Sequence, residues 1–251
     1  EEVDPSYLSR LLQSTSVLRK LSLQSLPRNS HELLYVLCSL DSLQYLELGH
    51  HLDLEQVSCL LHRQLDATPF NNVHTLCLQG DAKAVGRLLS SRTITILTLE
   101  VHDPDQNFYT AIGSMVQLRS LDIIFPPAEP VTQGGLEKFS TLLNLRRLRM
   151  SKMATHDILE DMLQLPWITD ELFGKFVANF PLLEQLHLHW DVSSQLSELA
   201  IDALATHCTS IERTVLMWHH NLDSWRSLKK PLFWKLKSLD LGSICDFAAS
   251  R

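Results

Sequence analysis

One spacing of apolar residues, L-x-x-L-x-L, recurs from end to end of this 251-residue chain. Successive copies begin 21 to 38 residues apart. The nine copies begin at Leu18, Leu43, Val73, Ile94, Leu118, Leu145, Leu183, Ile211 and Leu236. Of the marked positions, Thr214 alone is neither aliphatic nor Met. Self-similarity at this period predicts a stack of short structural repeats.

The spacing within each copy predicts a β-strand. Alternate residues of a strand face opposite sides, so the fourth and sixth positions point one way and their neighbours point to solvent. A single strand of this kind cannot bury its leucines. Stacked copies bury them together, so we expect parallel strands around one continuous core.

The segments between the strands have helical periodicity. Apolar residues of 196–204 and 108–115 fall on one helical face, and Thr169 and the Asp53–Gln56 pair are suited to cap helices. Helices are about 10 Å wide and paired strands about 4.8 Å apart. We therefore expect an α/β leucine-rich-repeat solenoid, a curved, right-handed horseshoe with parallel strands on its concave face and helices on its convex face.

The repeats predict a single domain over residues 1–251 with about nine irregular repeats. The step from Leu145 to Leu183 predicts a long repeat or an insertion at about 151–182, with helices over Thr155–Leu165 and Thr169–Phe180. An inserted helix on the convex face or the edge is favoured. The start at Glu1 suggests a fragment that lacks an N-terminal module. At the other end, we expect Leu239 and Leu241 to be poorly covered.

Composition excludes several classes of function. A net charge of −7 and a pI near 5.9 disfavour nucleic-acid binding. No apolar run reaches the roughly 18 residues that span a bilayer, so no membrane segment is expected. The five cysteines form no C-x-x-C pair, which favours a reducing compartment, cytoplasmic or nuclear.

The third, fifth and seventh positions of each copy should line the concave face. From Arg147 onward these positions become basic, with aromatic residues just past the strands. Arg, Trp and Met are enriched among interface anchors, so we predict that a protein partner binds here. The predicted contact patch is Arg147, Arg149, His187, His189, Trp190, Met217 and Trp218, with Asp122 beside it.

Two alternatives accompany this patch. Asp122 and Arg149 belong to neighbouring strands about 4.8 Å apart and can neutralise each other. Trp190 and Trp218 can instead be core residues, because large aromatic side chains are more often packed than exposed.

No catalytic, cofactor or metal site is expected. The chain has no G-x-S-x-G, P-loop, G-x-G-x-x-G or H-E-x-x-H motif, so an enzyme is not predicted. His187 and His189 share a strand face and lie near His219 and His220. Two imidazoles do not complete a metal site without further ligands.

Two junctions carry a family resemblance. Residues 199–212, with His207-Cys208 before the next strand, resemble the cysteine-containing leucine-rich repeat, and 177–188 resemble the same junction with Phe180-Pro181. Both are similar to repeats of F-box leucine-rich-repeat proteins, with irregular lengths as in fungal members. The resemblance implies a substrate-recognition part of a ubiquitin ligase receptor, joined to the ligase adaptor by an N-terminal F-box that is absent here. The alternative is a stand-alone regulatory or inhibitory repeat scaffold without a ubiquitin link.

Overall fold

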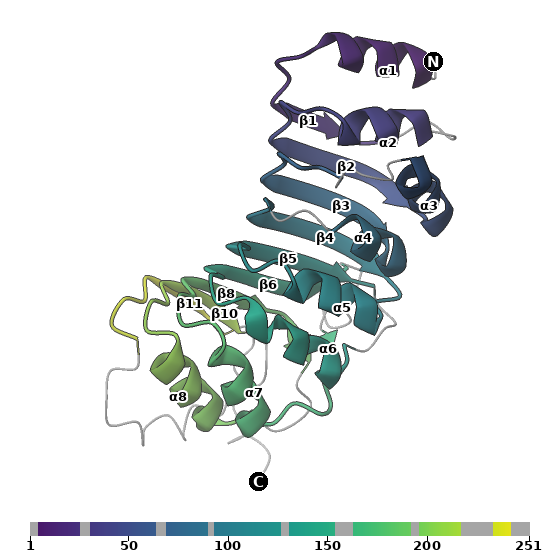
Figure 1. Cartoon of the computed structure of the whole chain (residues 1–251). Coiled ribbons are helices and arrows are strands. Elements are labelled where there is room, and N and C mark those ends of the chain that lie inside the picture. Colours follow the sequence, from purple (N-terminus) through teal and green to yellow (C-terminus); the bar gives the residue numbers. More distant parts are fainter. Residues whose placement is uncertain are drawn as a thin grey trace. The chain divides into compact units, whose positions relative to one another are not determined.

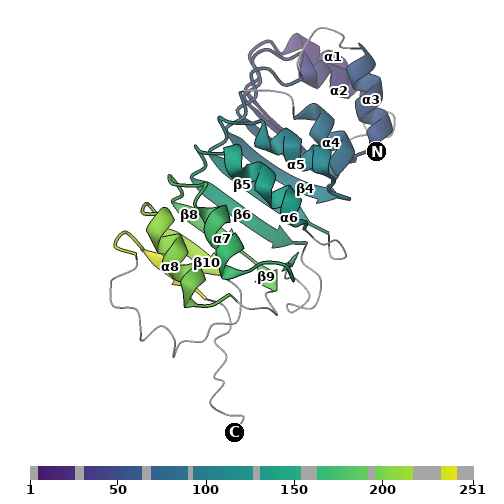
Figure 2. The same ribbon diagram turned by 60° about the horizontal axis from the view of Figure 1, so that its bottom comes forward.

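The computed structural model describes residues 5–25, 31–63, 69–89, 93–126, 131–153, 163–191, 196–216 and 233–241. The chain forms two compact units, Glu1–Leu118 (unit 1) and Arg119–Arg251 (unit 2). In each unit the strands lie side by side and the helices cover one side of them (Figures 1 and 2).

Unit 1 is a parallel sheet in the order β1-β2-β3-β4. Its strands are β1 (Lys20–Leu23), β2 (Tyr45–Leu52), β3 (Thr75–Asp81) and β4 (Ile96–His102). Its helices are α1 (Pro5–Ser14), α2 (His31–Cys38), α3 (Leu54–Arg63), α4 (Ala82–Leu88) and α5 (Gln106–Gly113). Each strand is followed by a helix that runs back to the start of the next strand, which is why all the strands run the same way.

Unit 2 repeats this arrangement in the order β5-β6-β8-β10-β11. Its strands are β5 (Ser120–Phe125), β6 (Arg147–Lys152), β8 (Gln185–Leu188), β10 (Arg213–Leu216) and β11 (Ser238–Asp240). Its helices are α6 (Gln133–Glu137), the 3-10 helix η1 (Lys138–Thr141), α7 (Asp170–Val177) and α8 (Glu198–His207). The short strands β7 (Leu163–Gln164) and β9 (Trp190–Asp191) pair separately.

The nine predicted strands are confirmed, and so is the register that stacks their apolar positions. In unit 1 the fourth position of the motif aligns from Leu46 to Leu76 to Leu97, and all three are fully buried. In unit 2 the aligned residues are Leu121, Leu148, Leu186, Thr214 and Leu239. The structure is therefore the predicted α/β leucine-rich-repeat solenoid fold, with parallel strands on one side and helices on the other.

The first and last strands are less well covered than the rest. Leu21 and Leu23 of β1 are half-buried, and Leu239 of β11 is 41% exposed. A repeat buries its apolar residues against its neighbours, so a strand with one described neighbour keeps part of that surface exposed.

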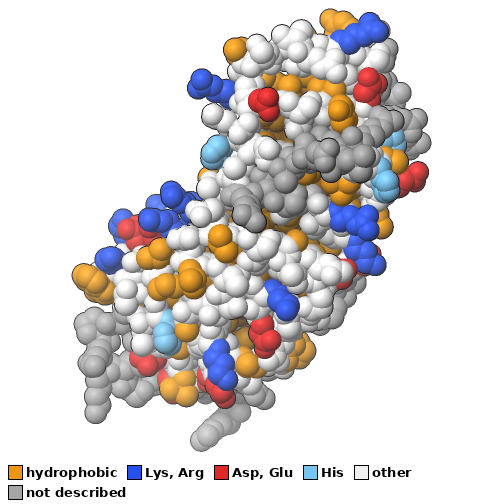
Figure 3. All heavy atoms as spheres, viewed as in Figure 1, with side chains coloured by type: hydrophobic (Ala, Val, Ile, Leu, Met, Phe, Trp, Pro, Cys, Tyr) orange, Lys and Arg blue, Asp and Glu red, His pale blue; other side chains and the backbone are white. Residues whose placement is uncertain are grey.

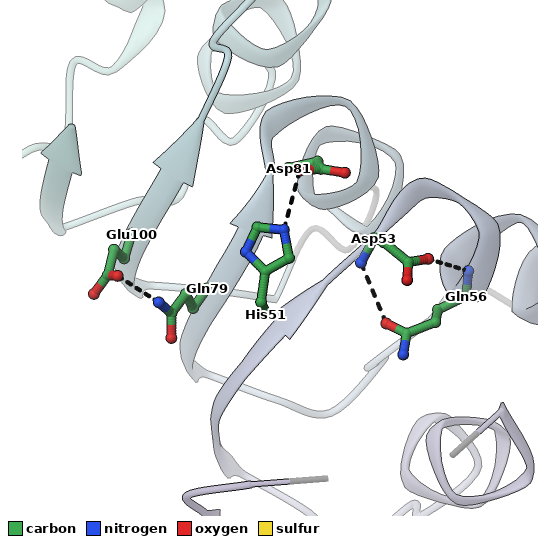
Figure 4. Close-up of polar contacts among 6 residues, drawn as sticks. All are labelled: His51, Asp53, Gln56, Gln79, Asp81 and Glu100. Carbon is green, nitrogen blue, oxygen red and sulfur yellow. Dashed lines mark hydrogen bonds and ion pairs between the residues drawn. The ribbon is translucent and has the colours of Figure 1, made fainter. Parts of the chain in front are cut away.

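The predicted helix starts are also confirmed. Asp53 and Gln56 form a reciprocal capping box, in which the backbone N–H of Gln56 donates to Asp53 Oδ1 (2.7 Å) and that of Asp53 donates to Gln56 Oε1 (3.2 Å) (Figure 4). Thr169 caps α7 by accepting from the Leu172 backbone N–H at 3.3 Å. These contacts satisfy amide groups that a helix start otherwise leaves without a partner.

The long repeat differs in part from its prediction. The helix expected over Thr169–Phe180 is present as α7. The other predicted helix, Thr155–Leu165, is wrong at its end, because Leu163 and Gln164 form β7 and pair with Trp190 and Asp191. Residues 154–162 lie outside the described part of the chain. No helix among the described residues is long and apolar enough to cross a membrane.

Candidate functional site

The strand face of unit 2 opposite its core carries the candidate site. In β5 and β6 the residues Leu121, Ile123, Leu148 and Met150 are buried, while Asp122, Arg147 and Arg149 between or beside them reach solvent. The same alternation continues through β8 and β10. We call the following side chains the basic face: Asp122, Arg147, Arg149, Gln185, His187 and Arg213.

Register places the basic face in two rows across the strands. Arg147 and Arg213 both align with Gln185, one from each side. Asp122 aligns with Arg149, and Arg149 aligns with His187. Neighbouring strands are about 4.8 Å apart, so these side chains are within reach of one another.

Asp122 is the one carboxylate of this face, and it is mostly enclosed. Its Oδ2 lies 3.7 Å from Arg149 Nη1, and its side chain is 23% exposed against 45% for Arg149. Burial raises the pKa of Asp122, and the positive charges of Arg149 and Arg147 oppose that rise. Asp122 Oδ1 has no hydrogen-bond partner within the described structure. Because a single carboxylate stands beside both Arg149 and Arg147, it offsets only part of the local positive charge.

His187 lies among the arginines. Burial lowers its pKa most, and the charges of Arg149, His189, Arg147 and Arg213 lower it further. Neutral imidazole is consequently favoured while no anion is near. Register places Arg149 next to His187, and Arg147 and Arg213 on the strands to either side of it.

Charges next to the basic face are already paired. Arg146 Nη1 lies 2.6 Å from Glu184 Oε1, and Lys237 Nζ lies 2.8 Å from Glu212 Oε2. By contrast, no carboxylate of the described residues pairs with Arg147 or Arg213. Figure 3 shows Lys and Arg side chains gathered with few acidic ones along the edge of unit 2 where its strands begin.

The strand face of unit 1 has a different character. Glu47 Oε2 accepts from Ser22 Oγ (2.9 Å) and from the Tyr45 hydroxyl (2.8 Å), and Lys20 lies over the Tyr45 ring. These two hydrogen bonds, of which that from Tyr45 is the stronger influence, lower the pKa of Glu47. Ser22, Tyr45 and Glu47 therefore satisfy one another on this face.

The far ends of β2, β3 and β4 are likewise internally paired. Gln79 donates to Glu100, and His51 Nε2 lies 3.1 Å from Asp81 Oδ1 (Figure 4). The rings of His51 and His102 meet edge to face at 5.2 Å. Such pairs leave fewer groups of unit 1 available to a ligand than the basic face of unit 2 offers.

The structure brings together part of the predicted contact patch. Arg147, Arg149 and His187 lie on the solvent side of adjacent strands, with Asp122 beside them. His189 follows β8 and is half-buried. Met217 and Trp218 lie outside the described residues, so their place in the patch stays a prediction.

Trp190 is a correction, because it is a core residue and not a contact residue. Its side chain is fully buried, with ring centroids 6.0 Å from those of both Phe173 and Phe176. The pairing of Trp190 with Leu163 turns the indole inward. Trp190 Nε1 has no hydrogen-bond partner within the described structure.

Arg213 and Gln185 belong to the basic face but were not part of the predicted patch. Both occupy the third position of their motif copies, as Arg147 does. Aligning the copies by register would have found them. Ser151 is the opposite case, because it occupies a predicted surface position and is buried.

The described part of the chain contains no group of three His, Cys, Asp or Glu side chains placed to hold a metal ion. His219 and His220 are outside that part. On the helical side of unit 2, a pocket of about 620 Å³ lies between α6, η1 and α7, and apolar side chains form much of its lining. Of its lining residues, Glu137 accepts a hydrogen bond from Gln133, and Lys175 pairs with Glu171. Arg147 and Arg213 of the basic face, by contrast, have no ion-pair partner among the described residues.

No protein-family model matches this chain, and no curated protein sequence matches it. Among solved structures, it is similar to a chain in the crystal structure of the yeast Rad7 and Elc1 complex. That match has 16% identity, covers 95% of this chain and 77% of the other, and has a TM-score of 0.43. A leucine-rich-repeat protein of Leptospira interrogans matches with 13% identity over 94% and 86% of the two chains, at a TM-score of 0.19. Both TM-scores are below 0.5, so the fold assignment rests on the strand register and burial described above.

Proposed function

We propose that this chain is a protein-recognition scaffold that binds its partner on the basic face of unit 2. The observation that carries this proposal is the separation of roles on each strand. Residues at the fourth and sixth motif positions build the core, whereas Arg147, Arg149 and Arg213 are exposed and contribute nothing to it. Arginine is one of the residue types enriched among the anchors of protein interfaces.

Charge reversal on the basic face tests this function. The double variant Arg147→Glu and Arg149→Glu is expected to abolish capture of the partner protein while the chain stays folded, because both side chains are exposed. The matched control is Lys138→Glu with Lys175→Glu, which reverses two charges on the helical side of unit 2. Unchanged capture by the first variant, with an unaltered circular dichroism spectrum, contradicts the proposal.

We propose further that the partner is a substrate of a ubiquitin ligase and that the chain is the recognition part of an F-box-type receptor in the cytoplasm or nucleus. The junction at Cys208 supports this. Its buried thiol lies 3.4 Å from the Val177 carbonyl oxygen and 3.5 Å from that of Phe180, which joins the two junctions that resemble the family.

The ligase connection is tested in cells on the full-length protein. A substrate receptor is expected to co-precipitate with the ligase adaptor and to shorten the half-life of its captured partner. Capture of the partner without adaptor binding or turnover would favour the stand-alone regulatory scaffold.

A further inference from the structure

Three arginines surround one small area of the basic face. Arg147 and Arg213 lie on either side of Gln185, so their backbones are two strand spacings, about 10 Å, apart. Arg149 lies two residues beyond Arg147 on the same side of β6 and aligns with His187. Because an extended arginine side chain covers several ångströms, all three guanidinium groups can meet one ligand group above Gln185 and His187.

This area has more positive charge than the described carboxylates of unit 2 neutralise. Arg147 and Arg213 have no carboxylate partner among the described residues, and Asp122 faces Arg149 from a half-buried position whose burial disfavours its ionised form. The chain as a whole has a net charge of −7, so the cluster is a local exception. Converging like charges repel each other, and an anionic ligand removes that cost.

We infer that the partner segment recognised by the basic face is multiply anionic: an acidic or phosphorylated stretch of polypeptide held by Arg147, Arg149 and Arg213. This inference rests on the proposed function and specifies the chemical class of the partner segment. Arginine binds carboxylates and phosphates through two parallel N–H···O bonds, which lysine cannot do. All three cations of the cluster are arginines.

A protein segment fits this area better than a nucleic acid. The cluster spans three strands, about 10 Å, which accommodates one phosphoryl group or two or three carboxylates. A nucleic-acid strand needs positive charge along a longer track, and the chain's overall negative charge repels it. Nucleic-acid binding is therefore an outcome that the test must be able to reveal.

His187 makes the recognition dependent on pH. The charged groups that act on it are Arg149 and Arg147 on β6, His189 after β8 and Arg213 on β10, and Asp122 on β5 lies on the far side of Arg149. A bound anion counteracts the nearby positive charges and raises the pKa of His187, so binding takes up a proton. Affinity then rises as the pH falls through the pKa of the bound state and levels off below that of the free state. Protonation of Asp122 at lower pH acts in the same direction, so a His187→Gln variant is needed to separate the two.

The binding test uses the full chain and four fluorescent probes. Three are peptides of one sequence that carry at the centre three Glu residues, one phosphoserine, or three Gln residues, and the fourth is a single-stranded oligonucleotide. The Glu or the phosphoserine peptide is expected to bind at least about tenfold more tightly than the Gln peptide, since charge-assisted hydrogen bonds are about twice as strong as neutral ones. Which of the two binds more tightly identifies the source of the anion.

Four substitutions make the test specific. Arg213→Gln and Arg147→Gln are each expected to weaken anionic-peptide binding about tenfold. Arg146→Gln is the matched control, because Arg146 is already paired with Glu184 and its loss should change affinity less than about twofold. His187→Gln should flatten the increase in affinity below neutral pH. Thermal unfolding of each variant verifies that the fold is intact.

Several outcomes overturn the inference. The inference is wrong if the Gln peptide binds as tightly as the anionic peptides, or if the oligonucleotide binds more tightly than they do. It is also wrong if Arg213→Gln leaves the affinity for the anionic peptides unchanged. These results differ from a failure of the proposed function. Suppose that Arg147→Glu with Arg149→Glu abolishes partner capture but neither anionic peptide binds. The basic face is then still the interface with the partner, and the inference of an anionic ligand is wrong.

Discussion

Gly80 of β3 lies so close to Leu52 of β2 that a Cβ atom on Gly80 would be 2.3 Å from the Leu52 carbonyl oxygen. The contact follows from a register shift. Leu48 pairs with Leu78, but His51 pairs with Gln79, so β2 contains two more residues than β3 over this stretch. The bulge brings the Leu52 backbone against β3, and glycine alone leaves room for it.

Substituting Gly80 by Ala should therefore destabilise unit 1. Because the clash is with backbone atoms, β2 or β3 must move, and a cost of roughly 2–3 kcal/mol is expected in the free energy of unfolding. Urea unfolding measures it. Gly174→Ala is the control of opposite sign, because its Cβ would meet only Ala203 Cβ at 3.4 Å and alanine favours a helix. Equal effects of the two substitutions would contradict this account.

The capping box of α3 gives a second prediction. Asp53→Ala removes the acceptor of the Gln56 backbone N–H and is expected to cost about 1 kcal/mol of stability. The exposed first-turn residue Glu55 is the matched control, and Glu55→Ala should change stability by less than about 0.5 kcal/mol. Denaturant titration of both variants compares them. A loss for Glu55→Ala as large as that for Asp53→Ala would show that first-turn charge, not the cap, stabilises the helix.

Much of this fold could be predicted because its determinants are local and repeated. The same apolar spacing marks every strand except the short β7 and β9, and aligning those spacings gives the observed register, as in Leu121, Leu148 and Leu186. The solvent-facing positions of Arg147, Arg149 and His187 could be predicted for the same reason, since these residues alternate with buried ones along their strands.

The parts that were wrong depend on contacts between distant segments. Leu163 and Gln164 fit a helical apolar pattern, but pairing with Trp190 and Asp191 makes them a strand. Burial of Trp190 depends on its contacts with Phe173 and Phe176 of α7, and no local sequence pattern predicts these contacts. The bulge at Gly80 likewise depends on a register shift between two strands.

Cysteine reactivity provides a third prediction. Burial raises the pKa of the Cys208 thiol to about 12, and the thiol is fully buried beside two carbonyl oxygens. Because the thiolate is the reactive form, Cys208 should resist alkylation in the folded protein, whereas the exposed Cys59 should react readily. Mass spectrometry after brief iodoacetamide treatment distinguishes the two, and both should react in urea. Rapid labelling of native Cys208 would contradict the packing of the α8 end.

Asp122 supplies a fourth prediction, on the pH dependence of stability. Its folded-state pKa is raised, mainly by burial, so the folded protein binds this proton more tightly than the unfolded chain. The ionised form therefore weakens folding, and the stability of the wild type should decrease as pH rises through the unfolded-state and then the folded-state pKa. Asp122→Asn should remove this decrease.

Stability curves from acid to neutral pH compare the two proteins. The variant should be at least as stable as the wild type at pH 7, and the two should converge at low pH. A variant less stable than the wild type at pH 7 would show that the Arg149 contact outweighs burial.

Thr214 is the one polar residue at a core position of the repeat motif, and it leads to the last prediction. It aligns with Leu186 and Leu239, is 1% exposed, and its hydroxyl has no hydrogen-bond partner within the described structure. A buried hydroxyl without a partner costs roughly 1–3 kcal/mol, and valine has nearly the same shape. Thr214→Val should therefore raise the free energy of unfolding by about 1 kcal/mol. The control is Thr98→Val on the solvent side of β4, which should shift it by less than about 0.5 kcal/mol. If Thr214→Val is less stable than the wild type, the hydroxyl has a hydrogen-bond partner in solution and the prediction is wrong. If the variant is more stable, the hydroxyl is not needed for folding of this repeat.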